Sequence, residues 1–242
     1  MSAANGNHEN DQLIRTLLNL PPSRTTFTKS QLAYVEVRKA IVTHSLPAGT
    51  PLDESYLLSL FPFGRTPLRE ALKRLNYEGL LSWPAHQAPS VRDVSMHEMQ
   101  YLYETRRILE PTIVMLAAKR ATKSDHEKLH ASVQAMIDAS KSGDIYVSVE
   151  QDYALHATIA NASQNSFLAE ASHQLNLRSL RMWYRNQTAH GIARIYEMHV
   201  ALVDAIVARD EQRCEELALH HIASSLNRQT TSLREVGSTL SK

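Results

Sequence analysis

The chain has 242 residues, 43% of them hydrophobic, which is enough for one large domain or two modest packed domains. Its formal net charge is only +1, so bulk charge does not by itself indicate a nucleic-acid partner, and its single cysteine excludes an intramolecular disulfide and a thiolate metal cluster. No apolar run reaches the roughly 18 residues of a membrane span and no signal-peptide pattern is present, so we expect a cytoplasmic protein without a membrane partner.

The composition predicts a mainly α fold. The chain has seven glycines and four phenylalanines, and its long stretches rich in Ala, Leu, Glu, Arg and His are untypical of a sandwich or barrel. Residues 1–27 are polar, contain Pro21 and Pro22, and show no sustained hydrophobic period. They predict a flexible N-terminal arm.

Residues 28–94 carry three helical patterns followed by a hairpin pattern. The third helix has the clearest ends, because Pro67 suits its first turn and Gly79 stands just past its last residue. Helices are expected over about 30–45, 53–60 and 65–78, and short strands over 80–83 and 90–94. Three helices and a small hairpin in this order predict a winged helix-turn-helix domain over residues 28–94.

The third helix separates an apolar stripe from a basic face. Its inward positions follow the i, i+3, i+4, i+7 spacing and are Leu68, Ala71, Leu72 and Leu75. Its outward positions are Arg65, Thr66, Arg69 and either Lys73 or Arg74. Such arginines can pair with guanine in the major groove, and Thr66 with the helix start can hold a phosphate. The alternative is an ordinary surface helix whose charges are only solvated.

The remainder of the chain predicts an all-α antiparallel bundle over residues 95–234, followed by a flexible tail over 235–242. Helices are expected at roughly 96–120, 124–140, 144–161, 165–186, 190–208 and 211–232. Asp152 and His156 have i, i+4 spacing and so share one helix face. His199 and His221 each lie eleven residues from Asp210, at the turn between the last two helices, so both sit at the same height in an antiparallel hairpin.

These four residues form a candidate metal site. Three imidazoles and a carboxylate suit a borderline divalent ion such as Zn²⁺, with Ni²⁺ or Mn²⁺ as other choices. His220 competes with His221, but neighbouring side chains differ by about 100° around a helix and only one can face inward with His199. A bundle that merely contains hydrogen-bonded core histidines is the alternative interpretation.

The N-terminal residues resemble the GntR family of transcriptional regulators. The family's Pro-x-Gly turn is matched by Pro47-Ala48-Gly49, and its Arg-Thr-Pro-x-Arg-Glu-Ala-Leu-x-Arg-Leu-x-x-Glu-Gly-Leu run is matched from Arg65 to Leu80. The resemblance implies DNA contacts by Arg65, Thr66 and Arg69 and a DNA-facing wing near His86. The sequence departs from the family pattern at Ser55, Gly64 and Ala88.

Residues from about 95 to 233 resemble the FCD ligand-binding domain of the FadR-like branch. Its motifs are matched by Arg106 to Glu110, by Asp152 to His156, and by the two later histidines. The resemblance implies metal ligation by Asp152, His156, His199 and His221, with Arg106 near an effector carboxylate. Six helices are more similar to the VanR-type subgroup than to the seven-helix FadR type.

We therefore expect a regulator, a repressor, that binds a palindromic double-stranded operator as a homodimer. A small carboxylate effector at the metal-containing site would change the spacing of the two DNA-reading heads. The predicted DNA contacts are Arg65, Thr66, Arg69, Lys73 and His86. A metalloenzyme using the same four ligands is an alternative from another class, and a regulator that senses the metal itself is a third.

Overall fold

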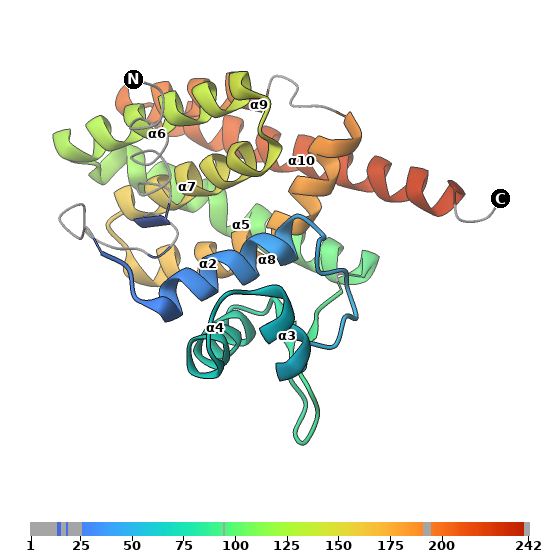
Figure 1. Cartoon of the computed structure of the whole chain (residues 1–242). Helices are drawn as coiled ribbons and strands as arrows, with labels where there is room; N and C mark the ends of the chain where they lie inside the picture. Colours follow the sequence, from blue (N-terminus) through green and yellow to red (C-terminus); the bar gives the residue numbers. More distant parts are fainter. Residues whose placement is uncertain (1–13, 16–17, 19–25, 94, 191–194, 240–242) are drawn as a thin grey trace. The chain divides into compact units, whose positions relative to one another are not determined.

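The structure is a computed structural model that describes residues 14–15, 18, 26–93, 95–190 and 195–239. The chain divides into two compact units, Met1–Asp93 and Val94–Lys242. Figure 1 shows the elements of each unit. Most of the predicted N-terminal arm over 1–27 lies outside the described residues, as does Val94 at the end of the predicted second strand.

The first unit is a winged helix-turn-helix, as predicted. Its elements are α2 (Lys29–Val42), α3 (Glu54–Leu60), α4 (Arg65–Tyr77), β1 (Leu81–Ser82) and β2 (Ser90–Val91). The two strands pair antiparallel, with Leu81 opposite Val91 and Ser82 opposite Ser90. They are shorter than the predicted 80–83 and 90–94. Pro84 and Pro89 lie between them, and proline cannot donate a ladder hydrogen bond.

The helices of this unit begin at side chains that satisfy their first backbone N–H groups. Thr28 and Gln31 form a capping box at α2, and the Asp53 carboxylate accepts a hydrogen bond from the Tyr56 N–H at the start of α3. The predicted stripe of α4 is buried, namely Leu68, Ala71, Leu72 and Leu75. Because α2 packs against α4, this stripe fixes the rotation of α4 and leaves its basic face outward.

The second unit consists, in its described residues, of six helices, as predicted. They are α5 (Met96–Arg120), α6 (Lys123–Ser142), α7 (Ile145–Ala162), α8 (Ser166–His190), α9 (Ile195–Val207) and α10 (Glu211–Thr239). Capping boxes at Ser95 and Thr122 begin α5 and α6. Helix α10 continues beyond the predicted end at 232 and into 235–239, where a flexible tail is expected.

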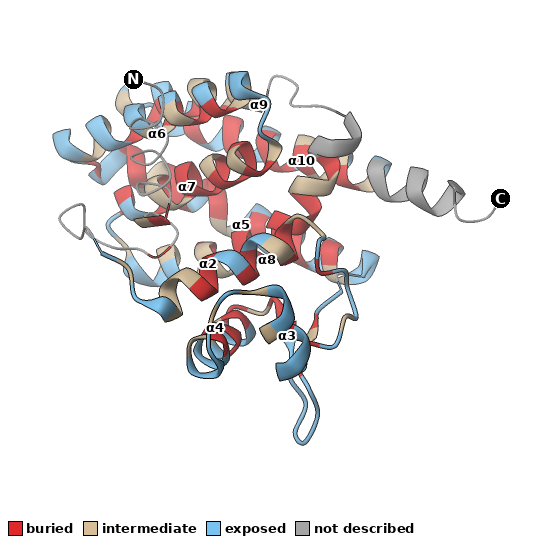
Figure 2. Cartoon of the chain, in the orientation of Figure 1, coloured by how far each residue is buried: buried red, intermediate tan, exposed pale blue. Residues whose placement is uncertain are grey.

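Helix α7 is the innermost element of the second unit. It packs against α5, α6 and α8, and Figure 2 shows it largely in the colour of buried residues. A helix buried on all sides normally carries apolar residues, yet α7 also buries Glu150, Asp152 and His156. In the part of the chain that the structure describes, no helix is both long and apolar enough to cross a membrane.

Candidate nucleic-acid interface and candidate metal centre

The predicted DNA-reading residues of α4 all lie on its exposed face. The side chains of Arg65, Arg69 and Lys73 are 79%, 67% and 59% exposed, and Thr66 is exposed beside them. Arg65, Thr66 and Arg69 extend from the first two turns of α4 and Lys73 follows one turn later, and the backbone N–H groups of Arg65 and Thr66 begin the helix. This is the end of a recognition helix that enters the major groove.

Two carboxylates already contact these cations. Oε1 of Glu54, in the first turn of α3, lies 2.7 Å from Nε of Arg65, and its other oxygen lies 3.9 Å from Nη2 of Arg69. Glu70 accepts a hydrogen bond of 2.8 Å from Nζ of Lys73. Exposed pairs of this kind contribute roughly 0.2–1 kcal/mol, so a phosphate or base edge can replace them. The contact of Glu54 with α4 was not predicted.

Arg74, the alternative to Lys73 as an outward residue, has a structural role instead. Its guanidinium lies 3.8 Å from the centre of the Tyr34 ring, and its Nε donates a hydrogen bond of 2.8 Å to Oε1 of Glu78. The Tyr34 hydroxyl donates to the same buried carboxylate at 2.9 Å. These contacts connect α2 to the end of α4, so Lys73 is the outward residue of the two.

The wing and two of the three departures from the family pattern, Ser55 and Gly64, have clear local geometry. His86 lies exposed in the loop between β1 and β2 with φ of 60°, the left-handed region. The Ser55 hydroxyl donates to the Asp53 carboxylate at 2.6 Å and so supports the start of α3. Gly64 is the N-cap of α4 and provides no side-chain cap, so the first N–H groups of α4 are left for another acceptor.

The second unit brings the four predicted ligands together. Asp152 and His156 come from α7, His199 from α9 and His221 from α10, and all four are buried. One ring nitrogen from each histidine lies within 4.8 Å of the others. Nε2 of His199 lies 3.0 Å from Oδ1 of Asp152 and 3.4 Å from Nε2 of His156. His220, the rejected alternative, is exposed.

Burial favours the neutral form of two of these imidazoles, those of His156 and His221. It lowers the pKa of His156 to about 3, with the charges of His199 and Arg106 acting in the same direction and Asp152 against it. Burial also lowers the pKa of His221 well below its usual value, and His199, His156 and Arg106 reinforce the effect. A neutral imidazole has a ring nitrogen with a free lone pair, which is the form that binds a metal.

The spacing of the ligand atoms fits a single ion. Ligands held at about 2.1 Å from one ion, at the angles of octahedral or tetrahedral coordination, lie about 3.0–3.4 Å apart. The two short separations around Nε2 of His199 fall in this range. Oδ1 of Asp152 is buried and accepts no hydrogen bond from the described residues, as expected of an oxygen placed to bind a cation. The residues therefore fit a divalent metal.

Arg106 is a buried cation next to this cluster. It lies on α5 with no exposed surface, and its Nε donates a hydrogen bond of 2.5 Å to Glu110. Burial acts to lower its pKa, but Glu110, Tyr103 and Asp152 outweigh this and raise the pKa. Among the described residues, nothing accepts a hydrogen bond from its Nη1 or Nη2. A buried guanidinium with two unused nitrogens is suited to a carboxylate ligand.

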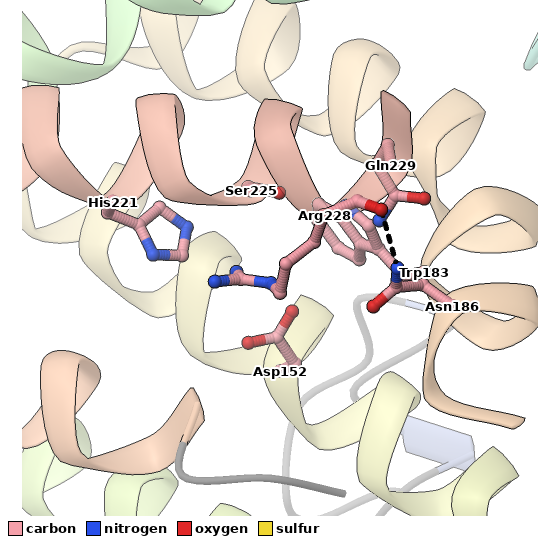
Figure 3. A pocket seen from close by; sticks show the side chains of 7 residues that line it. All are labelled: Asp152, Trp183, Asn186, His221, Ser225, Arg228 and Gln229. Atoms are coloured by element: carbon pink, nitrogen blue, oxygen red, sulfur yellow. Dashed lines mark hydrogen bonds between the residues drawn. The ribbon is translucent and has the colours of Figure 1, made fainter. Parts of the chain in front are cut away.

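A pocket opens beside Asp152 and His221 and contains residues that the sequence analysis did not select. Figure 3 shows its lining, which comes from α7, α8 and α10 and consists of Asp152, Trp183, Asn186, His221, Ser225, Arg228 and Gln229. The three lining residues of α10 could have been found from the sequence by their helical spacing. Ser225, Arg228 and Gln229 follow His221 at i+4, i+7 and i+8 and therefore share its face of the helix. Trp183 and Asn186 carry no such spacing signal.

The comparisons with known proteins agree with this division into a DNA-reading unit and a buried site. The sequence matches the description "Bacterial regulatory proteins, gntR family" over residues 29–85 and "FCD domain" over 101–224. A winged helix-turn-helix joined to such a helical domain defines a DNA-binding transcriptional regulator. The chain belongs to the GntR family of bacterial regulators and carries an FCD domain.

Its relatives are also regulators. The chain is 28% identical to the Nta operon transcriptional regulator of Aminobacter aminovorans, over 75% of this chain and 85% of the relative. It is 26% identical to the galactonate operon transcriptional repressor of Escherichia coli, over 84% and 97%. In fold it is similar to E. coli McbR/YncC, with a TM-score of 0.73 and 21% identity over 86% of this chain and 100% of that one. The prediction of a non-enzyme is thus confirmed, and the metalloenzyme alternative is set aside.

Proposed function

We propose that the protein is a repressor that binds a palindromic operator as a homodimer and is released when a small organic acid binds at the buried metal site. The observation that carries this proposal is the convergence of three buried histidines, Asp152 and the unused guanidinium nitrogens of Arg106. Several relatives are named as operon repressors, among them the galactonate and gluconate repressors. Action on DNA would place the protein in the cytoplasm.

The DNA-reading role falls to the exposed face of α4 and to the wing. Arg65 and Arg69 extend from the helix end that enters the groove and can pair with guanine edges, while Thr66 and the uncapped N–H groups hold a phosphate. Lys73 adds a phosphate contact one turn later, and His86 reaches the backbone or minor groove from the wing. A direct base contact of this kind contributes roughly 1–3 kcal/mol of discrimination.

Two copies are needed because one winged helix reads only a short half-site. Helix α5 offers an apolar surface for the second copy: Tyr101 is 62% exposed and Ile108 is 68% exposed, and their i, i+7 spacing places both on one face. A twofold pair formed through α5 would present two heads to a palindrome.

The site would hold a divalent ion through Asp152, His156, His199 and His221, most readily zinc, with nickel or manganese as other choices. When bound, such an ion supplies positive charge and coordination positions for a carboxylate oxygen. Arg106 would bind the same carboxylate through Nη1 and Nη2, held in place by Glu110 and by the rings of Tyr103 and Trp183 at 4.9 and 5.1 Å. Effector binding would then favour a conformation in which the two winged helix-turn-helix units of the dimer are spaced so that they no longer fit the operator.

The experiment that tests the proposal measures metal content and DNA binding in the same untagged preparation. Mass spectrometry gives the metal per chain, and fluorescence anisotropy follows binding to the DNA upstream of the gene, with and without carboxylates. Near-stoichiometric metal with acid-sensitive DNA binding supports the proposal. DNA binding that responds to added metal and to no acid would favour the alternative in which the metal is the signal. If the purified protein contains no metal and still binds DNA, the four residues are not a metal site.

A further inference from the structure

The pocket beside the histidines contains a second cation that the proposed function does not use. Arg228 lies on α10, two turns after His221 and on the same face of the helix. In Figure 3 its side chain runs along the pocket, and its guanidinium points toward His221 and Asp152. Within the described part of the chain, the guanidinium makes no hydrogen bond and no ion pair at contact distance, so its donors are available to a ligand.

We propose that the effector is a short dicarboxylate, and that Arg228 binds the carboxylate farther from the histidines. This inference rests on the proposed function, because the first carboxylate is the one bound at the histidine cluster and Arg106. Beyond the proposed function, the inference specifies the chemical class of the acid and identifies Arg228 as the residue that selects it.

The charges around the pocket favour a dianion. The charge of Arg106 is balanced by Glu110 at 2.5 Å. Among the described residues, Asp152 is the carboxylate that acts on Arg228, and it also serves the histidine cluster. Imidazoles that bind a metal do so in their neutral form, so the histidines add no charge to the metal-loaded site. A divalent ion at the cluster therefore leaves two positive charges without a partner, and a buried charge is stable only when it is paired.

The size and polarity of the pocket favour a short acid with few hydroxyl groups. The free space is about 20 Å³, where one water requires roughly 10–15 Å³, so Arg228 must swing outward to admit an acid and would then bind its second carboxylate. Nδ2 of Asn186 already donates to the Arg228 carbonyl at 2.9 Å, and the Ser225 hydroxyl lies 2.7 Å from that of Tyr103. Gln229 remains as a further amide in the lining, which is fewer partners than the several hydroxyls of a sugar acid need.

The test compares acids of equal length with one and two carboxylates. Isothermal titration calorimetry of the metal-loaded full-length protein would use malonate against propionate and succinate against butyrate. We expect the better dicarboxylate to bind roughly tenfold to a hundredfold more tightly than its monocarboxylate partner. Arg228→Met should abolish this preference and change monocarboxylate affinity less than about threefold, while Arg228→Lys should retain part of it.

Arg213→Met is the matched control, because Arg213 is an exposed arginine on the same helix that pairs with Glu216. It should leave both affinities unchanged, and circular dichroism with metal analysis should show that each variant folds and retains its metal. Equal binding of mono- and dicarboxylates by the unmodified protein, or an unchanged preference in Arg228→Met, would overturn the inference and leave the proposed function intact. Failure of every acid to bind would overturn both.

Discussion

The two units hold their functional side chains in opposite ways. On α4 the cations are exposed and are held by surface carboxylates, with Arg65 79% and Glu54 45% exposed at a separation of 2.7 Å. In the helical unit the functional atoms are buried, and several lack any hydrogen-bond partner among the described residues, such as Oδ1 of Asp152 and both terminal nitrogens of Arg106. The DNA-reading unit is ready for a large polyanion, whereas the helical unit is incomplete until a small ligand enters.

This difference has an energetic consequence. Exposed ion pairs are exchanged for DNA phosphates at little cost, so the DNA-reading face should respond to single substitutions by graded changes that depend on salt. Buried polar groups without partners are destabilising until they are satisfied, so the histidine cluster should respond to loss of one ligand by near-complete loss of the bound ion. The predictions below test this contrast.

The largest effect is expected from His199→Ala. Nε2 of His199 lies close to both Asp152 and His156. Its removal leaves three proposed ligands, Asp152, His156 and His221, without the imidazole that connects them around one ion. Metal content should fall from near one per chain to below about a tenth. The response to carboxylates should be lost as well, while operator binding without effector remains. Mass spectrometry and anisotropy titrations provide the measurements.

His220→Ala is the matched control for this experiment. His220 is the next residue to the ligand His221 but lies exposed on α10. Its removal should change neither metal content nor effector response. Loss of metal in His220→Ala, or retention of metal in His199→Ala, would show that the predicted ligand set is incorrect.

The buried histidines also predict acid sensitivity of the metal-free protein. Their pKa values are lowered by burial, that of His156 to about 3, so the unfolded chain binds more protons than the folded chain between about pH 3 and 6.5. Stability is therefore fully present above pH 6.5 and falls as the pH drops. At pH 5.0 His156 should remove about 2 kcal/mol from the free energy of unfolding, and His221 should act in the same direction.

Urea unfolding of the helical unit, measured in a chelator at pH 7.5 and 5.0, tests this expectation. The DNA-reading unit provides an internal comparison, because its functional cations are arginines and a lysine that do not titrate in this range. His156→Gln should reduce the pH dependence, because the contribution of that imidazole is removed. An unchanged free energy of unfolding between the two pH values would mean that these histidines are not buried neutral.

On the exposed face the expected effect is smaller. Arg69→Ala removes one base contact per head, which should weaken operator binding roughly tenfold to a hundredfold at physiological salt. Metal content and thermal stability should not change, because the Arg69 side chain is 67% exposed. Arg213→Ala, which removes an exposed arginine of the helical unit, is the control. Normal operator binding by Arg69→Ala would mean that α4 is not the recognition helix.

The features that could be predicted from the sequence are those set by local spacing. The buried stripe of α4 follows from positions 68, 71, 72 and 75, and the clustering of the three histidines with Asp152 follows from an i, i+4 pair and two histidines equidistant from Asp210. Both depend only on helical periodicity. Helical periodicity alone did not show whether Lys73 or Arg74 faces outward. That depends on a contact between helices, because Arg74 of α4 packs on the ring of Tyr34 in α2.

The features that could not be predicted depend on contacts between elements or on where an element ends. Arg228 enters the site because α8 and α10 pack with Trp183 and Asn186 beside it, and no spacing in α8 indicates this. Helix α10 continues to Thr239, beyond the end that its sequence pattern indicates. The strands shorten to two residues each, because two prolines lie between them and proline cannot donate a ladder hydrogen bond. Glu54 is a further example, since its partners lie on the next helix.

Glu54 also provides the smallest predicted effect and the sharpest test of the exposed face. Its carboxylate contacts Arg65 and Arg69, so DNA must displace it before either arginine can bind, and its charge then lies near the phosphates. Glu54→Gln should therefore tighten DNA binding by about twofold to fivefold at low salt, an effect that diminishes as salt screens it. Glu216→Gln breaks an equally exposed pair with Arg213 on α10 and should have no effect. Weaker binding by Glu54→Gln would mean instead that the carboxylate positions the arginines for DNA, so that the exposed face, like the buried cluster, depends on a preformed arrangement.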